Sequence, residues 1–314
     1  MSIGTFPVDI IKSRMVVHCM KAYKIKEEAI KLFLLICSIT VVMLLFGIFL
    51  LLLLKTIPAF KEISIKEFFT TPLWNPAGYY KEQYGILAMV VSTLMVTAGA
   101  MIIAVPLGIG TAAYLNEIAN HKVREILKPI IEILAGIPSV VIGFLGIVLL
   151  GPIITKVFGV KSGLNALNGS ILLAVMALPT IISISEDALN SVPKSFGEAS
   201  YALGANRWQT LVRIKIPAAL SGIIASCMLG MGRAIGETMT VLMATGCATA
   251  MPHSFFDPVR TMTSAIAIEL GEVAFDSTHY YALFAVGLVL FLMTFAVNMA
   301  SDVILNKYQL MERK

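Results

Sequence analysis

Long apolar runs, separated by short polar segments, dominate the chain. Residues 32–54 contain no charged side chain, which is enough length for one helix to cross roughly 30 Å of hydrocarbon. Five further runs are apolar over most of their length, and two of them carry isolated charges. The pattern predicts six membrane-spanning helices, at residues 32–54, 86–115, 130–154, 170–185, 217–246 and 280–300.

Composition supports an all-α integral membrane protein. The 314 residues are 58% hydrophobic and 14% charged, with a mean hydropathy of +0.86, well outside the range of soluble domains. A signal peptide is the rival interpretation of the first run, but that run is longer than a signal core of roughly 7–15 residues. We therefore expect an N-terminal segment at 1–31, a first transmembrane helix at 32–54, a transmembrane domain at 86–300 and a tail at 301–314.

Basic residues predict the orientation of these helices. The N-terminal segment, the second and fourth loops and the tail together carry 16 Lys and Arg, against 7 in the first, third and fifth loops. Because positive residues are retained on the cytoplasmic side during insertion, both termini are expected to be cytoplasmic. The net charge of +5 follows from this bias and gives no reason to expect a nucleic-acid partner.

The predicted spans contain Gly and Pro, as in "AVPLGIG" (104–110), "AGIPSVVIGFLG" (135–146) and "ALPTII" (177–182). Such breaks are tolerated where neighbouring helices or a cavity satisfy the freed backbone groups. They fit a bundle built around a pathway and ordinary kinking equally well.

No cofactor is expected to bind this chain. The cysteines and histidines are scattered without metal-ligand spacing, so neither a disulfide framework nor a metal site is indicated. A GxxxxGK[ST] phosphate-binding loop is also missing from the sequence, so any ATP would have to be bound by another subunit.

The segment at 186–216, on the side predicted to be cytoplasmic, has a clear local design. A short helix containing Glu198 and Ala199 is expected to end at Gly204, and a second is expected to begin at Asn206, a candidate N-cap. Pro217 is placed to open the next membrane helix. The pattern predicts two short helices at a corner.

This corner resembles the EAA-xxx-G-x9-I-x-L-P motif of ABC importer permeases. The matching residues are Glu198, Ala199, Ser200, Gly204, Ile214, Ile216 and Pro217. Ser200 replaces the second Ala and Ile216 replaces Leu, and both changes keep the residue size. Four longer stretches, at 74–94, 131–146, 232–246 and 261–272, are similar to phosphate-specific transport permeases, and the GETM sequence at 236–239 resembles the C-type subunit.

The resemblance implies a type I ABC importer permease in a bacterial-type inner membrane. In that family the corner is a coupling helix that docks into an ATP-binding subunit. The implied partners are a homologous A-type permease subunit, two ATP-binding subunits that hold ATP and Mg, a periplasmic phosphate-binding protein and membrane lipid. The chain itself would be a non-catalytic subunit that translocates phosphate.

Arg233 and Glu237 lie inside the fifth predicted span, where each charge costs roughly 2.5–3.5 kcal/mol. If the span is one helix, their spacing puts them on one face and close enough to pair. One interpretation is a self-neutralising pair that packs the helix. The other is a translocation pathway in which Arg233 attracts phosphate and Glu237 orients it, with hydroxyls of Thr240 and, less favourably placed, Thr238.

Three other features carry weaker expectations. Glu132, near the start of the third predicted span, is expected to reach the cytoplasmic interface near Lys128, and a role in the pathway is the alternative. The run from Thr261 to Leu270 is expected to be a short helix at the outer surface, either meeting the binding protein or forming an outer gate, or simply lying at the interface. Trp74, Tyr79, Tyr80 and Tyr84 fit an interfacial aromatic belt.

Two alternatives remain at this point. A permease for another oxyanion, such as molybdate or sulfate, would share the architecture. A secondary transporter or channel would need no ATPase, and the corner argues against it because such a protein has no use for a docking element.

Overall fold

A computed structural model describes residues 8–78 and 82–312, except for the side chains of 8–26, 29 and 304–312. The chain divides into two compact units, Met1–Leu54 and Lys55–Lys314. Within the described part of the first unit, helix α1 (Val8–Glu62) begins and runs on without interruption into the second. Its apolar side chains from Ile30 to Leu54 are largely exposed, as expected of a helix that faces lipid or another membrane helix.

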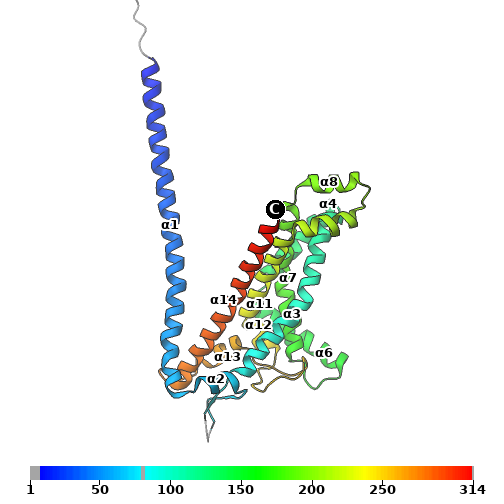
Figure 1. Ribbon diagram of the computed structural model, residues 1–314. Helices are drawn as coiled ribbons and strands as arrows, with labels where there is room; N and C mark the ends of the chain where they lie inside the picture. Colours follow the sequence, from blue (N-terminus) through cyan, green and yellow to red (C-terminus); the bar gives the residue numbers. More distant parts are fainter. Residues whose placement is uncertain (1–7, 79–81, 313–314) are drawn as a thin grey trace, which may run out of the picture. The chain divides into compact units, whose positions relative to one another are not determined.

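The second unit is a helical bundle with one short hairpin (Figure 1). The hairpin pairs Trp74 with Tyr84 in antiparallel register. The remaining elements are α2 (Ile65–Thr70), β1 (Trp74–Asn75), β2 (Gln83–Tyr84), α3 (Leu87–Ala113), η1 (Tyr114–Ile118), α4 (His121–Gly136), α5 (Ser139–Leu145), η2 (Gly146–Leu150), α6 (Gly151–Phe158), α7 (Ala166–Ser191), α8 (Lys194–Ala202), α9 (Arg207–Thr210), η3 (Leu211–Lys215), α10 (Ile216–Ala218), α11 (Leu220–Gly236), α12 (Met239–Ala244), α13 (Met262–Glu269) and α14 (Thr278–Glu312). The η elements are single π-helical turns that continue the neighbouring α-helices.

Five described helices are long and apolar enough to cross a membrane, and a sixth span is formed if a pair bent by 72° is counted as one. The five are Ile30–Glu62, Leu87–Ile118, Ser139–Phe158, Ala166–Ser191 and Thr278–Val303, and the bent pair is Arg207–Ala218 with Leu220–Gly236. Each overlaps one of the six predicted runs. The fourth is longer than expected, because α7 continues to Ser191 and so includes the first residues of the segment assigned to the corner.

The third predicted span, 130–154, is wrong at its start. Helix α4 ends at Gly136, Ile137 is extended (φ −69°, ψ 127°), and a new helix begins at Ser139. The cause is Pro138, whose ring disfavours helical geometry at the preceding residue. Glu132 consequently lies in α4, which is separate from the candidate span that begins at Ser139.

The fifth predicted span, 217–246, is also not one helix. Helix α11 ends at Gly236, and Glu237 is extended (φ −68°, ψ 132°) before α12 begins at Met239. The hydroxyl of Thr263 in α13 donates to the carbonyl of Glu237 at 3.0 Å. This bond satisfies a backbone group that the break frees, which is the condition for irregular backbone at membrane depth.

The core of the bundle is the packing of α3, α7 and α11. Ile181 of α7 is fully buried and lies between two glycines. A Cβ at Gly108 of α3 would be 2.6 Å from its Cγ2, and one at Gly230 of α11 would be 2.8 Å from its Cγ1. Both values are below ordinary carbon contacts, so the absence of side chains lets the three helices approach closely.

Candidate functional site

The corner between α7 and α11 folds as its sequence predicts. Gly204 has φ +83° and ends the first short helix in the left-handed region, which favours glycine. The Asn206 side chain accepts from the Gln209 backbone at 2.8 Å, and Gln209 accepts in return from the Asn206 backbone at 2.9 Å. This capping box starts α9. The expected pair of short helices is confirmed, with α8 beginning at Lys194.

Large apolar side chains on this corner are exposed. Leu203 is 90% exposed, Trp208 63% and Phe196 49%. Beside them lies an open groove of about 500 Å³, lined by Phe196, Ala199, Ser200, Leu203, Ala205, Arg213, Ile214 and Ala218. Exposed apolar patches with polar surroundings mark sites where another protein binds.

The motif residues divide between the surface and the interior of the corner. Glu198 and Ala199 are exposed, whereas Ser200 is buried and its hydroxyl shares a hydrogen bond with Thr210 at 3.0 Å. Ile214 and Ile216 are half-buried, and Pro217 lies in the short α10. The structure therefore brings the seven motif residues into one compact element, with Glu198 and Ala199 facing outward.

A buried carboxylate in η1, directly after α3, contacts the corner: Glu117. It accepts from the Tyr201 hydroxyl and forms an ion pair with Lys215. The hydrogen bond to Glu117 raises the pKa of the Tyr201 phenol, with burial and the carboxylate charge adding to the effect. Sequence reasoning missed Glu117 because its partners are 84 and 98 residues away along the chain.

A second buried carboxylate, Glu186 of α7, lies at the same end of the bundle. Its side chain is 2% exposed; Arg124 donates to it through Nε at 3.1 Å, and Lys128 Nζ lies 3.6 Å away. Both cations belong to α4, so this cluster fixes α4 to α7. The acidic pair Glu186–Asp187 at the end of an apolar run was a signal available in the sequence.

Arg233 and Glu237 do not form the predicted ion pair. The i,i+4 geometry requires a continuous helix, and α11 ends between the two residues. The Arg233 guanidinium is exposed on the single chain and instead donates to the Thr180 hydroxyl of α7 at 3.3 Å. Among the described residues, Arg233 has no carboxylate within ion-pair distance.

The two threonines after Glu237 also differ from expectation. Thr240 is fully buried, and its hydroxyl lies 3.0 Å from the Ser139 carbonyl and 3.0 Å from the Met176 sulfur. It is therefore occupied by structural contacts and does not share a face with Arg233. Thr238 is half-buried, and its hydroxyl donates to the Gly236 carbonyl at 3.3 Å across the helix break.

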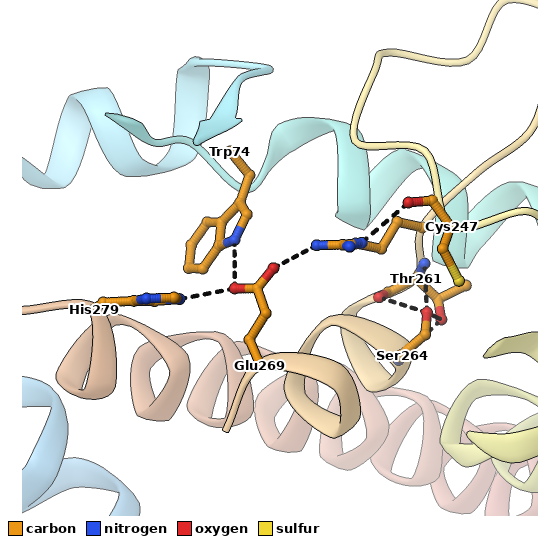
Figure 2. Close-up of polar contacts among 7 residues, drawn as sticks. Trp74, Cys247, Thr261, Ser264, Glu269 and His279 are labelled. Carbon is orange, nitrogen blue, oxygen red and sulfur yellow. Dashed lines mark hydrogen bonds and ion pairs between the residues drawn. The ribbon is translucent and has the colours of Figure 1, made fainter. Parts of the chain in front are cut away.

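The opposite end of the bundle holds a polar cluster around Glu269 (Figure 2). Trp74 donates through its indole nitrogen at 2.8 Å, His279 Nε2 lies at 2.8 Å, and Arg260 pairs with the other carboxylate oxygen. Burial alone raises the pKa of Glu269, but the bonds from His279 and Trp74 and the charge of Arg260 outweigh it and hold the pKa below its ordinary value. One side chain thus joins β1, α13, α14 and the loop before α13.

The short helix expected after Thr261 exists as α13, with a capping box between Thr261 and Ser264. Its first half is buried in the bundle, whereas Ala267 and Leu270 near its end are exposed. The expected aromatic belt is not formed as predicted. Trp74 and Tyr84 are 4% and 6% exposed, so they belong to the core and not to an aromatic belt. Tyr79 and Tyr80 lie outside the described residues.

No group of three or more His, Cys, Asp or Glu side chains within the described part of the chain could hold a metal ion. The arrangement is a membrane-type helical bundle with an exposed apolar corner at one end, and its polar clusters join helices to one another.

Comparison with known proteins supports that description. Residues 104–308 match the family described as binding-protein-dependent transport system inner membrane component. A probable ABC transporter permease protein, YqgH of Bacillus subtilis, is 42% identical over 233 residues, covering 74% of this chain and 75% of that protein. The phosphate transport system permease protein PstC of Mesorhizobium japonicum is 36% identical over 250 residues, covering 74% and 75%.

A solved structure has the same fold. A bacterial ABC transporter involved in the import of the acidic polysaccharide alginate aligns with a TM-score of 0.58 at 15% identity, covering 95% of this chain and 98% of that chain. At this identity the likeness concerns the fold, which is that of a type I ABC importer permease.

Proposed function

The chain belongs to the binding-protein-dependent transport system inner membrane components, and from that membership we propose that it is the permease subunit of an ATP-driven importer of inorganic phosphate. It works as a membrane component that moves the anion, while a separate subunit binds ATP and Mg. The phosphate assignment is supported by relatives named PstC that are 31–36% identical to this chain. The full assembly would add an A-type permease, two ATP-binding subunits and a phosphate-binding protein.

The observation that carries this proposal is the apolar corner. Leu203 and Phe196 are exposed and line the groove, and Trp208 of the same corner is also exposed. A rigid, capped helix pair with protruding apolar anchors suits the pocket of a partner protein. We propose that closure of the ATP-binding subunits moves this corner and thereby reorients the bundle.

Arg233 is the proposed anion-attracting residue of the pathway. Its guanidinium is exposed on a helix face near the break between α11 and α12, and planar guanidinium groups suit phosphate oxygens. Because Glu237 does not neutralise it in this structure, its charge is available to an anion. Glu237, half-buried at the break, would limit how tightly the anion is held.

The decisive experiment uses proteoliposomes that contain the complete complex, with the binding protein and ATP supplied. Uptake of labelled phosphate, with sulfate and molybdate as competitors, is measured together with ATP hydrolysis. We expect competition by phosphate alone. Uptake that continues without the ATP-binding subunits would contradict the importer proposal.

The corner is tested in the same assay with Gly204→Asp. This change strains a residue at φ +83° whose Cβ would meet no atom within 4 Å, so the bundle itself should still assemble. We expect the ratio of phosphate imported to ATP hydrolysed to fall at least about fivefold, the lower limit of typical coupling energies. The matched control is Gly159→Asp, at φ +66° with similar open space but at the far end of α6, which should leave the ratio unchanged.

A further inference from the structure

Glu117 is the side chain that connects both parts of the corner to a membrane helix. It lies in η1, the last turn of the span Leu87–Ile118. Its carboxylate accepts from Tyr201 of α8 and pairs with Lys215 of η3. Two other side-chain bonds of the described corner, Ser200 with Thr210 and Asn206 with Gln209, stay inside it.

This contact is shielded from solvent. The side chain of Glu117 is 7% exposed and that of Lys215 is 21% exposed. Removing one member of a buried pair leaves an uncompensated charge, which is strongly unfavourable. The contact is therefore expected to persist when the corner is pushed, whereas apolar surfaces such as that around Leu211 can slide over one another.

The other carboxylates at this end do not have this arrangement. Glu186 is also buried, but its ion pairs join α4 to α7 and reach neither α8 nor α9. Glu125 is 65% exposed and pairs with His121 of its own helix. Among these three, only Glu117 makes a polar contact between the corner and the span that contains α3.

From Glu117 into the bundle, a continuous series of closely packed helices leads to Arg233. Helix α3 packs along α7 and also contacts α11, and Ile181 is held between Gly108 and Gly230 without room for extra atoms. The neighbouring Thr180 accepts the hydrogen bond from Arg233. A displacement of η1 is thus transferred to the helices around Arg233, because packed interiors shift as rigid bodies and do not deform gradually.

We propose that Glu117 is the positioning residue that transmits movement of the α8–α9 corner to α3 and so to the anion pathway. This inference rests on the proposed importer function. Spatial connection is not proof of coupling, so it is tested by its energetic consequence.

The test measures the ratio of phosphate imported to ATP hydrolysed in proteoliposomes of the complete complex. The variants are Glu117→Gln, Tyr201→Phe, Lys215→Met and the double variant Glu117→Gln/Tyr201→Phe. We expect Glu117→Gln to lower the ratio at least about fivefold, while the assembled complex still hydrolyses ATP. The double variant should be no worse than Glu117→Gln alone, because both changes break the same contact.

Two controls separate transmission from general stability. Glu186→Gln also removes a buried charge at this end, so it should lower the thermal unfolding temperature without changing the ratio. Glu125→Gln should change neither. If Glu117→Gln fails to assemble, Tyr201→Phe and Lys215→Met take its place, because each removes one contact of Glu117. A lower ratio of phosphate imported to ATP hydrolysed in these variants would support the inference, and an unchanged ratio would overturn it.

An unchanged ratio in assembled Glu117→Gln would overturn the inference, and so would an equal fall in Glu186→Gln. Gly204→Asp distinguishes failure of the Glu117 inference from failure of the proposed function. If Gly204→Asp lowers the ratio and Glu117→Gln does not, the corner couples by another contact. If neither lowers it, the coupling role of the corner itself is wrong.

Discussion

At the residue scale, this chain uses buried carboxylates as joints between helices. Glu117 and Glu269 each contact cations or donors from at least two other elements, and Glu186 contacts two cations of α4. In a membrane bundle the apolar effect gives little preference for one helix arrangement, so directional polar contacts help to specify it. A carboxylate with several partners also avoids the cost of an unpaired buried charge.

Glu269 offers a test of this view. Its folded pKa is depressed, so its ionised form contributes stability above the usual value of 4.5, and this contribution is lost as the pH falls through the folded pKa. Glu269→Gln should lower the free energy of unfolding by roughly 3 kcal/mol at pH 7. It should also remove the loss of stability at low pH that protonation of Glu269 causes. Thermal unfolding of the purified chain at pH 7 and at pH 4 measures both effects.

The control for that variant is Glu272→Gln. Glu272 is exposed and lies three residues along the chain, so the same chemical change there should leave the unfolding temperature within about 1 °C of wild type, because surface substitutions rarely exceed ±0.5 kcal/mol. If the two variants behave alike, the network around Glu269 contributes nothing specific.

Arg233 yields the second residue-scale prediction. Arg233→Gln should assemble normally, since the side chain is exposed, but lower phosphate uptake at least about tenfold, because a hydrogen bond to a charged group contributes about 1.5–3 kcal/mol. Arg233→Lys should lower phosphate uptake less, since lysine keeps the positive charge and lacks only the planar guanidinium group. Thr180→Val removes only the bond that orients Arg233, so its rate of phosphate uptake should lie between those of wild type and Arg233→Gln. Normal uptake by Arg233→Gln would make this residue a packing group.

At the element scale, the sequence predicts helices better than it predicts their ends. The corner is correctly predicted because Gly204 and Asn206 act on their immediate neighbours. The break at Ile137 was also readable, since Pro138 follows it. The break at Glu237 was not, because the bond that satisfies its backbone carbonyl comes from Thr263, a residue 26 positions away. The pairings of Glu117 and Glu186 are non-local in the same way.

The packing of α3 on α7 gives an element-scale prediction. Gly108→Ala places a Cβ 2.6 Å from Ile181 Cγ2, so overpacking should cost roughly 1–3 kcal/mol. Gly110→Ala, two residues along the same helix, meets no atom within 4 Å and should be neutral or stabilising by up to about 1 kcal/mol. Thermal unfolding in detergent compares the two.

A double-variant cycle identifies the cause. Ile181→Ala removes the Cγ2 atom that the new methyl group would meet, so Gly108→Ala should cost much less in that background. Additive costs would mean that the glycine is needed for some reason other than its approach to Ile181.

At the scale of the whole molecule, the second unit has two distinct ends (Figure 1). Helices α4 and α8 and the C-terminal end of α14 lie at one end, and α2, α6 and α13 lie at the other. The basic residues of the second and fourth loops belong to the first end. The positive-inside rule predicts that this end is cytoplasmic, as a corner that docks with an ATP-binding subunit requires.

Orientation is measured by matched cysteine substitutions in a chain whose own cysteines are replaced. Lys161 lies between α6 and α7 and Lys194 at the start of α8, and both are exposed. In cells with a permeable outer envelope, a membrane-impermeant maleimide should label Lys161→Cys at once and Lys194→Cys after the inner membrane is opened. Phosphate uptake by the cysteine-free parent is the control for native insertion. The reverse labelling order would put the corner outside the cytoplasm, beyond the reach of any ATP-binding subunit, and the coupling roles of Gly204 and Glu117 would fall with it.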